Sequence, residues 1–287
     1  MRRVKSVWMS GVSCLALWSG CALAVAAEAP VRLKVHGSTT VSPIATEAAE
    51  ILRQERGWEI VIDTQGGSSG GLSALGDGLV DIGMISRPLT DEDLSRYPAA
   101  RFHASAIGLD GVALIVSRPV WEAGVRALSK EEVQAIYEGR VTNWKTLGGP
   151  DAPIVFYDKE PGRGTWEVFA DWAYGNHRQA PLASHPEVGG NEETRQKVAS
   201  HPAAMSQLSV AWAESSDQVK ILGIRLVDGQ VAYPTREAIR NRTYPMARTL
   251  YLVTNGEAAG AAAEFIRFVL SKQGQAIVEK HGYLPIS

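Results

Sequence analysis

Three short turns rich in glycine and hydroxyl residues stand where a strand is expected to meet a helix, and they constrain the fold most. They read GSTT at residues 37–40, GGSSGG at 66–71 and GRGT at 162–165. A helix start leaves its first N–H groups unpaired and carries partial positive charge, so it favours an anion. Glycine lets the backbone approach a ligand closely, and Ser or Thr adds a hydroxyl donor. Three such turns predict a site with many donors for a small oxyanion.

The stretches around these turns alternate between strand and helix patterns, which predicts an α/β fold with mixed, mostly parallel sheets. Strands are predicted at residues 31–35, 59–64, 80–86, 107–117, 153–157 and 248–254. Helices are predicted from the first turn to residue 56, from the second turn to residue 75, and at 130–137, 165–174, 191–200 and 258–280. Gly57 is expected to end the first helix, and Ser129 with Glu132 forms a capping box for the third.

Two of these strands are expected to cross between two lobes. Residues 107–117 are long and apolar, and residues 248–254 return near the end of the chain. We therefore assign residues 27–112 and 249–287 to lobe I and residues 113–248 to lobe II. Two lobes joined by two crossings form a hinge, and ligands favour the cleft at the carboxyl ends of the strands.

The first 26 residues are predicted to be a cleaved export signal. Arg2, Arg3 and Lys5 form a basic start, an apolar run follows, and the residues up to Ala26 fit the small-x-small cleavage rule. A less favoured interpretation is lipidation at Cys21. Both cysteines, Cys14 and Cys21, lie inside this signal, so the mature chain is expected to have no disulfide and no cysteine metal site.

The charge of the mature chain excludes several partners. Removing the three positive charges of the signal takes the formal net charge from −2 to −5. A net-acidic body argues against nucleic acid and anionic membranes, which both require a basic surface. The six histidines show no metal-ligand spacing, and no cofactor motif is present, so neither a metal nor a cofactor is predicted.

Longer segments, in order along the mature chain, resemble the periplasmic phosphate-binding proteins of ABC transporters. They include VHGSTTVSPIA, TQGGSSGGLSALGDGLVDIGMISRPL, EPGRGTWEVF and YPMARTLYLVT. The resemblance implies the two-lobed periplasmic-binding-protein fold, whose lobes close over the anion and present it to a membrane permease. It implies no enzymatic activity, a monomer, and a periplasmic location.

The resemblance also implies the binding residues, which come from the three turns, from the end of the third strand and, for Lys159, from just before the third turn. The implied ligand-binding set is Ser38, Thr39, Thr40, Ser68, Ser69, Gly70, Ser86, Arg87, Lys159, Arg163, Gly164 and Thr165. No catalytic or metal-binding residue is implied.

Three positions depart from the family's pattern. Arg87 stands where many relatives carry an aspartate that accepts the proton of hydrogen phosphate, and Lys159 and Arg163 replace an arginine and a serine. Without that carboxylate, selection against sulfate needs another acceptor, for which Asp81 and Asp158 are candidates.

Three functions therefore stay open. The first is a transport receptor for phosphate or a related oxyanion. The second is an anion sensor or interaction protein with a changed ligand, such as sulfate or a phosphonate. The third is an exported esterase or phosphatase, for which neither a Gly-x-Ser-x-Gly elbow with a plausible histidine partner nor a metal cluster is evident.

Overall fold

The computed structural model describes residue 1 and residues 30–181 and 184–286. The predicted export signal, its cleavage point after Ala26, and both cysteines lie outside the described residues. Within the described part of the chain, no helix combines the length and apolarity that crossing a membrane requires.

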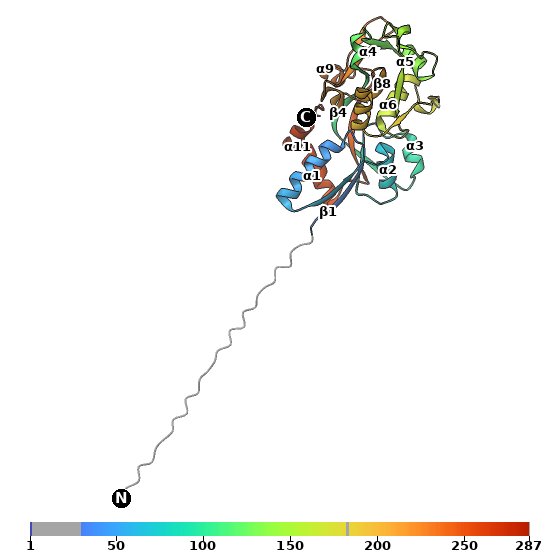
Figure 1. The fold of residues 1–287 in the computed structure, drawn as a ribbon. Helices are drawn as coiled ribbons and strands as arrows, with labels where there is room; N and C mark the ends of the chain where they lie inside the picture. Colours follow the sequence, from blue (N-terminus) through green and yellow to red (C-terminus); the bar gives the residue numbers. More distant parts are fainter. Residues whose placement is uncertain (2–29, 182–183, 287) are drawn as a thin grey trace.

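One half of the molecule is built from the beginning and the end of the chain (Figure 1). In chain order its elements are β1 (Arg32–Gly37), α1 (Ser42–Arg56), β2 (Glu59–Asp63), α2 (Gly67–Gly76), β3 (Ile82–Ile85), α3 (Asp91–Arg96), the first part of β4 (Phe102–Ser117), most of β11 (Ala247–Asn255), α10 (Gly260–Leu270) and α11 (Lys272–Lys280).

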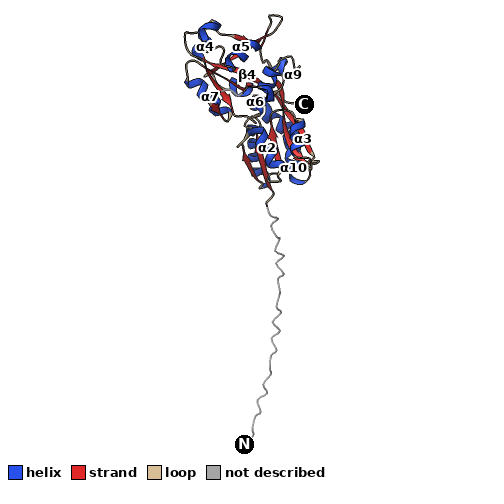
Figure 2. Ribbon diagram, turned by 90° about the vertical axis from the view of Figure 1, so that its right-hand side faces the viewer, coloured by secondary structure: helices blue, strands red, loops and turns tan. Residues whose placement is uncertain are grey.

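The other half is built from the middle of the chain, and Figure 2 shows its helices around a group of strands. Its elements are α4 (Arg118–Glu122), β5 (Ala127–Ser129), α5 (Lys130–Tyr137), the 3-10 turn Trp144–Leu147, β6 (Val155–Lys159), α6 (Gly164–Tyr174), the 3-10 turn His177–Gln179, β7 (Glu187–Val188), α7 (Asn191–Ser200), β8 (Ala204–Ser209), α8 (Val210–Glu214), β9 (Val219–Arg225), β10 (Val231–Ala232) and α9 (Arg236–Arg240).

Strands β4 and β11 join the halves. The main path of the sheet runs β2-β1-β3-β11-β4-β8-β6-β7, with β9 pairing off it to β4, β5 and β10. Strand β1 is parallel to β2 and β3, and β6 is parallel to β7 and β8, whereas β11 and β4 run antiparallel to their neighbours. The α/β class with mixed sheets is confirmed, and the two crossing strands account for much of its antiparallel part.

Each half has apolar layers on both faces of its strands, because side chains alternate along a strand. In β4, Leu114 packs with α5 and α6 on one face, and its neighbour Ile115 packs with α7 and α8 on the other. In β3, Met84 faces α1, α10 and α11, whereas Ile85 faces α2. This layering holds the turns between strands and helices at the edge where the halves meet.

Several local predictions are confirmed. Gly57 ends α1 with a left-handed φ of 69° and donates its N–H to Arg53. Ser129 and Glu132 form both bonds of a capping box at the start of α5. These signals are strong because each satisfies backbone groups that a helix end leaves unpaired.

The prediction of one long helix over residues 258–280 is wrong, because the segment is divided into α10 and α11. Ser271 adopts an extended conformation (ψ 166°), and its hydroxyl accepts the N–H of Gly274 as an N-cap. A Cβ at Gly274 would lie 2.3 Å from the carbonyl oxygens of Phe268 and Val269, so the tight corner requires glycine. The apolar periodicity continues across the break, which hides it from the sequence pattern.

Candidate anion-binding site

Four helix starts meet around one small cavity between the two halves. The segment before α1, the first turns of α2 and α6, and the first residue of α7 all line it, together with the ends of β3 and β6. The lining residues are Ser38, Thr39, Thr40, Gly67, Ser68, Ser86, Lys159, Arg163, Gly164, Thr165 and Asn191. The space for the centre of a water-sized sphere is about 10 Å³. Four helix starts of this kind create a strongly anion-favouring environment.

Nine of the twelve residues implied by the sequence line this cavity, and Ser69, Gly70 and Arg87 do not. Asn191 was not recognised from the sequence, although the helix that it begins was predicted. The missing signal is the glycine pair before it: Gly189 and Gly190 lead from β7 into α7, as glycines do in the other three turns.

Arg248 connects the hydroxyl groups of the cavity. This β11 side chain, 2% exposed, donates to Thr165 Oγ1 at 2.9 Å, to Ser86 Oγ at 3.3 Å and to Thr40 Oγ1 at 3.3 Å. These hydroxyls come from α6, from the end of β3 and from the turn before α1. One guanidinium therefore fixes donors from both halves of the molecule.

The charge of Arg248 is balanced by Asp110 of β4, whose carboxylate lies 2.7 Å from Nη2 and 3.1 Å from Nε. Both side chains are almost fully buried. Sequence reasoning missed this pair, but a signal existed, because each residue is a lone charge inside an otherwise apolar crossing strand. A buried charge needs a partner of opposite charge, and each of these two strands carries one of the two charged residues.

Lys159 is buried at the end of β6 without a carboxylate partner. Its Nζ donates to Thr194 Oγ1 at 2.7 Å and to the Gly189 carbonyl at 3.2 Å, and no ion pair within 4 Å is found among the described residues. Burial and the nearby cations Arg163 and Arg248 hold the pKa of Lys159 well below its usual value. The cavity thus contains one cation whose charge a bound anion would balance.

Replacing Lys159 by methionine is expected to stabilise the anion-free protein while weakening anion binding. Because the pKa of Lys159 is lowered in the folded state, the unfolded chain binds more protons than the folded one between the folded pKa and the ordinary lysine pKa. The penalty is complete below the folded pKa and fades as the pH rises towards the unfolded value. We expect Lys159→Met to raise the free energy of unfolding by about 1 kcal/mol or more at pH 7 and to weaken phosphate binding about tenfold or more.

Urea unfolding at pH 7 and pH 9.5, with calorimetric titration of phosphate, measures both effects. The exposed Lys145→Met variant serves as control. A Lys159→Met protein less stable than the unmodified chain at pH 7 would contradict the assignment of Lys159 as an unbalanced buried cation.

Arg163 lines the cavity, but its charge is balanced locally. Its Nη2 and Nε lie 2.6 Å and 2.9 Å from the carboxylate of Glu160, three residues earlier. Its side chain also packs beside Gly67 of α2, since a Cβ added there would lie 2.9 Å from Arg163 Cδ. Arg163 therefore contributes to the contact between the halves as well as to the wall of the cavity.

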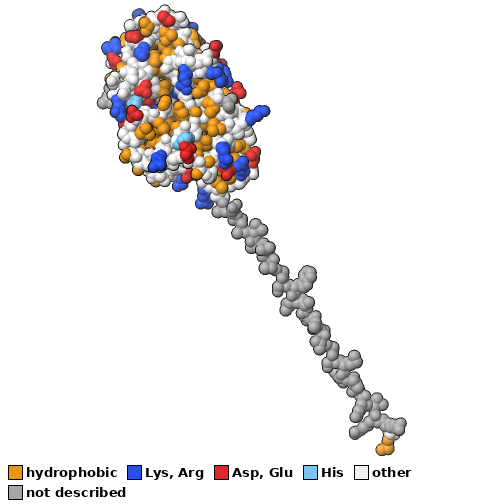
Figure 3. Space-filling model, turned by 180° about the vertical axis from the view of Figure 1, so that it is seen from behind, with side chains coloured by type: hydrophobic (Ala, Val, Ile, Leu, Met, Phe, Trp, Pro, Cys, Tyr) orange, Lys and Arg blue, Asp and Glu red, His pale blue; other side chains and the backbone are white. Residues whose placement is uncertain are grey.

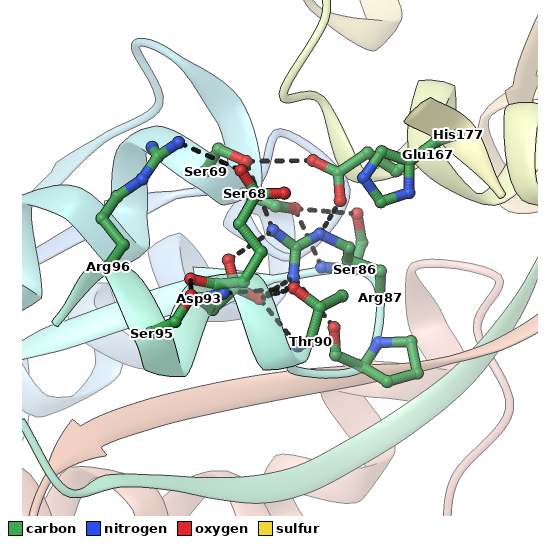
Figure 4. A network of polar contacts seen from close by, with 12 residues as sticks. Ser68, Ser69, Ser86, Arg87, Thr90, Asp93, Ser95, Arg96, Glu167 and His177 are labelled. Carbon is green, nitrogen blue, oxygen red and sulfur yellow. Dashed lines mark hydrogen bonds and ion pairs between the residues drawn. The ribbon is translucent and has the colours of Figure 1, made fainter. Parts of the chain in front are cut away.

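Arg87 lies outside the cavity, in a network of polar contacts next to it (Figure 4). Its Nη1 lies 2.6 Å from Asp93 of α3, its Nε forms an ion pair with Glu167 of α6, and Nη2 donates to Ser69 Oγ at 3.3 Å. Ser69 Oγ in turn donates to Glu167 at 2.9 Å. Two carboxylates thus balance Arg87, which bridges the two halves.

Asp81 and Asp158, the two carboxylates proposed as acceptors of the phosphate hydrogen, also lie outside the cavity. Asp81 accepts the backbone N–H of Lys34 at 2.8 Å. Asp158 accepts the Tyr137 hydroxyl and the Gln207 amide, each at 2.6 Å, and burial raises the pKa of its carboxyl. Neither residue lines the cavity, and among the described residues no aspartate or glutamate does.

Comparison with known proteins identifies the family. The sequence model of a family described as PBP superfamily domain matches residues 24–273. The chain is 30% identical over 263 residues to the phosphate-binding protein PstS of Borreliella burgdorferi, covering 88% of this chain and 90% of the relative. It is 28% identical over 260 residues to PstS of Bacillus subtilis, covering 89% and 81%.

Solved structures agree with these relatives. A putative phosphate ABC transporter substrate-binding protein from Clostridium perfringens, with bound phosphate, superposes with a TM-score of 0.77 at 28% identity, covering 89% of this chain and 100% of the other. An ABC-type phosphate transport receptor from Vibrio cholerae gives 0.69 at 27% identity, covering 88% and 99%. The chain therefore belongs to the PBP superfamily, in the family of the PstS-type solute-binding proteins.

Proposed function

We propose that this protein is an extracytoplasmic receptor that captures inorganic phosphate between its two halves and delivers it to an ABC permease. The observation that carries the proposal is the cavity itself, where four helix starts, six hydroxyl side chains and the buried Lys159 converge. The relatives named for phosphate binding, and the neighbour solved with bound phosphate, support this choice of anion.

The donors are sufficient for tight binding. Charge-assisted hydrogen bonds contribute about 1.5–3 kcal/mol each, and micromolar affinity requires about 8 kcal/mol. Four to six such bonds, shared between the halves, reach that affinity after the free energy of closing the halves is subtracted. The proposal includes no catalysis, because the described hydroxyls of the cavity have no histidine or carboxylate next to them that would act as a base.

We propose that binding is coupled to closure of the lobes, with residues 27–112 and 249–287 moving against 113–248 about β4 and β11. Three contacts that would break on opening support this motion. They are the backbone bond from Ser69 to Gly162 at 3.0 Å, the bond from Asn191 to Thr40 at 3.0 Å, and the ion pair between Arg87 and Glu167.

We propose that the chain is exported, is cleaved after Ala26 and acts as a monomer, with lipidation at Cys21 as the alternative anchor. The net charge of −5 after cleavage supports a role without nucleic acid. On the face shown in Figure 3, Lys and Arg side chains are intermixed with Asp and Glu. A basic binding surface for a polyanion needs these charges separated.

The proposal is tested by calorimetric titration of anion-stripped residues 27–287 with phosphate at pH 7.5. We expect tight binding without release of product from phosphate esters. The double variant Ser38→Ala, Thr165→Ala is expected to bind phosphate about 10- to 100-fold more weakly, because two hydroxyl donors are lost. Ser200→Ala is the control, because that exposed hydroxyl donates to the Lys197 carbonyl at the far end of α7 from the cavity. A folded protein that binds no phosphate would contradict the proposal and favour a receptor for another anion.

A further inference from the structure

The hydroxyl groups around the cavity are arranged as donors. Five of the six hydroxyl oxygens, all except that of Thr39, already accept a hydrogen bond from an N–H group of the protein. Ser38 Oγ accepts from Thr40 N at 3.1 Å, and Ser68 Oγ from Ser86 N at 3.1 Å. Arg248 supplies the bond to Ser86, to Thr165 and to Thr40. Ser68 Oγ and Ser86 Oγ also lie 3.4 Å apart, so one of these two hydroxyls donates its hydrogen to the other. The remaining hydrogens of these five hydroxyls point elsewhere, which favours an anion with bare oxygens.

Asn191 presents a different kind of group to the cavity. The residue is 1% exposed and lines the cavity, and its Nδ2 donates to Thr40 Oγ1 at 3.0 Å. Its Oδ1 is buried, and no described residue donates a hydrogen bond to it. A buried carbonyl oxygen without a donor is unfavourable, and such groups in folded proteins call for an explanation.

We propose that Asn191 Oδ1 accepts the hydrogen of hydrogen phosphate and is the residue by which this cavity distinguishes phosphate from sulfate. The inference rests on the proposed function and specifies the protonation state of the ligand. Phosphate near neutral pH carries a hydrogen, and the donor hydroxyls leave the amide oxygen as the acceptor for it. Sulfate carries none, so its oxygen would face Oδ1 with neither group donating.

The amide takes the place of the carboxylate that the sequence lacks at Arg87. An amide oxygen carries a partial charge, whereas a carboxylate carries a full one. The repulsion between Asn191 and a bare sulfate oxygen is therefore weaker than a carboxylate would produce. We expect the unmodified protein to prefer phosphate to sulfate, and an aspartate at position 191 to enlarge that preference.

The test is calorimetric titration of phosphate and of sulfate into anion-stripped residues 27–287 at pH 7.5, for the unmodified protein, Asn191→Leu and Asn191→Asp. Asn191→Leu removes the acceptor at similar size. We expect it to weaken phosphate binding about tenfold and to leave sulfate binding nearly unchanged, so that the preference collapses. Asn191→Asp should keep phosphate binding and lose sulfate binding. Aspartate is favourable in the first turn of α7, so this variant is expected to fold even if Asn191→Leu does not.

Asn241→Leu, at an exposed residue after α9, is the control and should leave both affinities unchanged. An unchanged phosphate-to-sulfate ratio in a folded Asn191→Leu or Asn191→Asp protein would overturn the inference and leave the proposed function intact. Equal weakening of both anions by Asn191→Asp would show that the amide donates through Nδ2, which also overturns it. An unmodified protein that binds no phosphate would overturn the proposed function together with the inference.

Discussion

Asp110→Asn should lower the free energy of unfolding by about 3–5 kcal/mol, because it leaves the guanidinium of Arg248 buried without a counter-charge. The two side chains lie on the crossing strands β4 and β11, and neither is more than 3% exposed. Water cannot replace the lost carboxylate there. Arg248 also holds Thr40, Ser86 and Thr165, so the loss should reach the anion site and weaken phosphate binding as well.

Urea denaturation of the anion-stripped protein measures this effect. Asp217→Asn is the matched control, since that side chain is 93% exposed and pairs only with Lys220 at 3.2 Å. It should change the free energy of unfolding by less than about 0.5 kcal/mol. The double variant Asp110→Leu, Arg248→Met should recover much of the stability, because both charges are removed together. If Asp110→Asn were as stable as Asp217→Asn, Asp110 would not be the group that balances Arg248.

Gly164→Ala should weaken phosphate binding more than about 100-fold and leave the free energy of unfolding nearly unchanged. A Cβ at this first residue of α6 would lie 2.6 Å from both Ser68 Oγ and Ser86 Oγ. The added methyl group would therefore hold the start of α6 away from Ser68 and Ser86 in the opposite half. Two charge-assisted bonds lost in this way account for at least a factor of about 100. Alanine is a better helix former than glycine, so α6 itself should form normally.

Calorimetric titration gives the affinity, and thermal unfolding without anion gives the stability. Gly229→Ala is the control, because Gly229 lies in an exposed turn between β9 and β10 and has open space around it. Its positive φ of 83° predicts some loss of stability with no loss of affinity. Phosphate binding by Gly164→Ala at the strength of the unmodified protein would show that α6 need not approach Ser68 and Ser86.

The general position of the site was predictable because it depends on local chemistry. Turns such as 37–40 and 162–165 need glycine and hydroxyl residues next to each other in the chain, and nine residues that the resemblance implied, seven of them in such turns, do line the cavity. The α/β class follows from the same alternation of strands and helices. The capping box at Ser129 is local in the same way.

Long-range electrostatic partners were not predictable in this way. Arg87 was grouped with the donors by its place after β3, yet Asp93 and Glu167 surround it, and Glu167 is 80 residues away in the sequence. Strand β8 was missed because Ser206, Gln207 and Ser209 look unlike a buried strand, although all three are fully buried. Polar side chains that find partners only in the folded state carry no periodic signal.

The unbalanced charge of Lys159 bears on how a permease could distinguish a loaded receptor from an unloaded one. The bridge formed by Arg87 favours closed molecules whether or not they carry cargo, and a permease that recognised shape alone would then accept unloaded ones. Lys159 opposes this in the proposed closure, because covering the cavity without an anion leaves its charge buried without a carboxylate partner. An arriving anion balances that charge, so the closed form would report occupancy. In the proposed cycle, the same lysine that weakens the fold would keep unloaded receptors from closing.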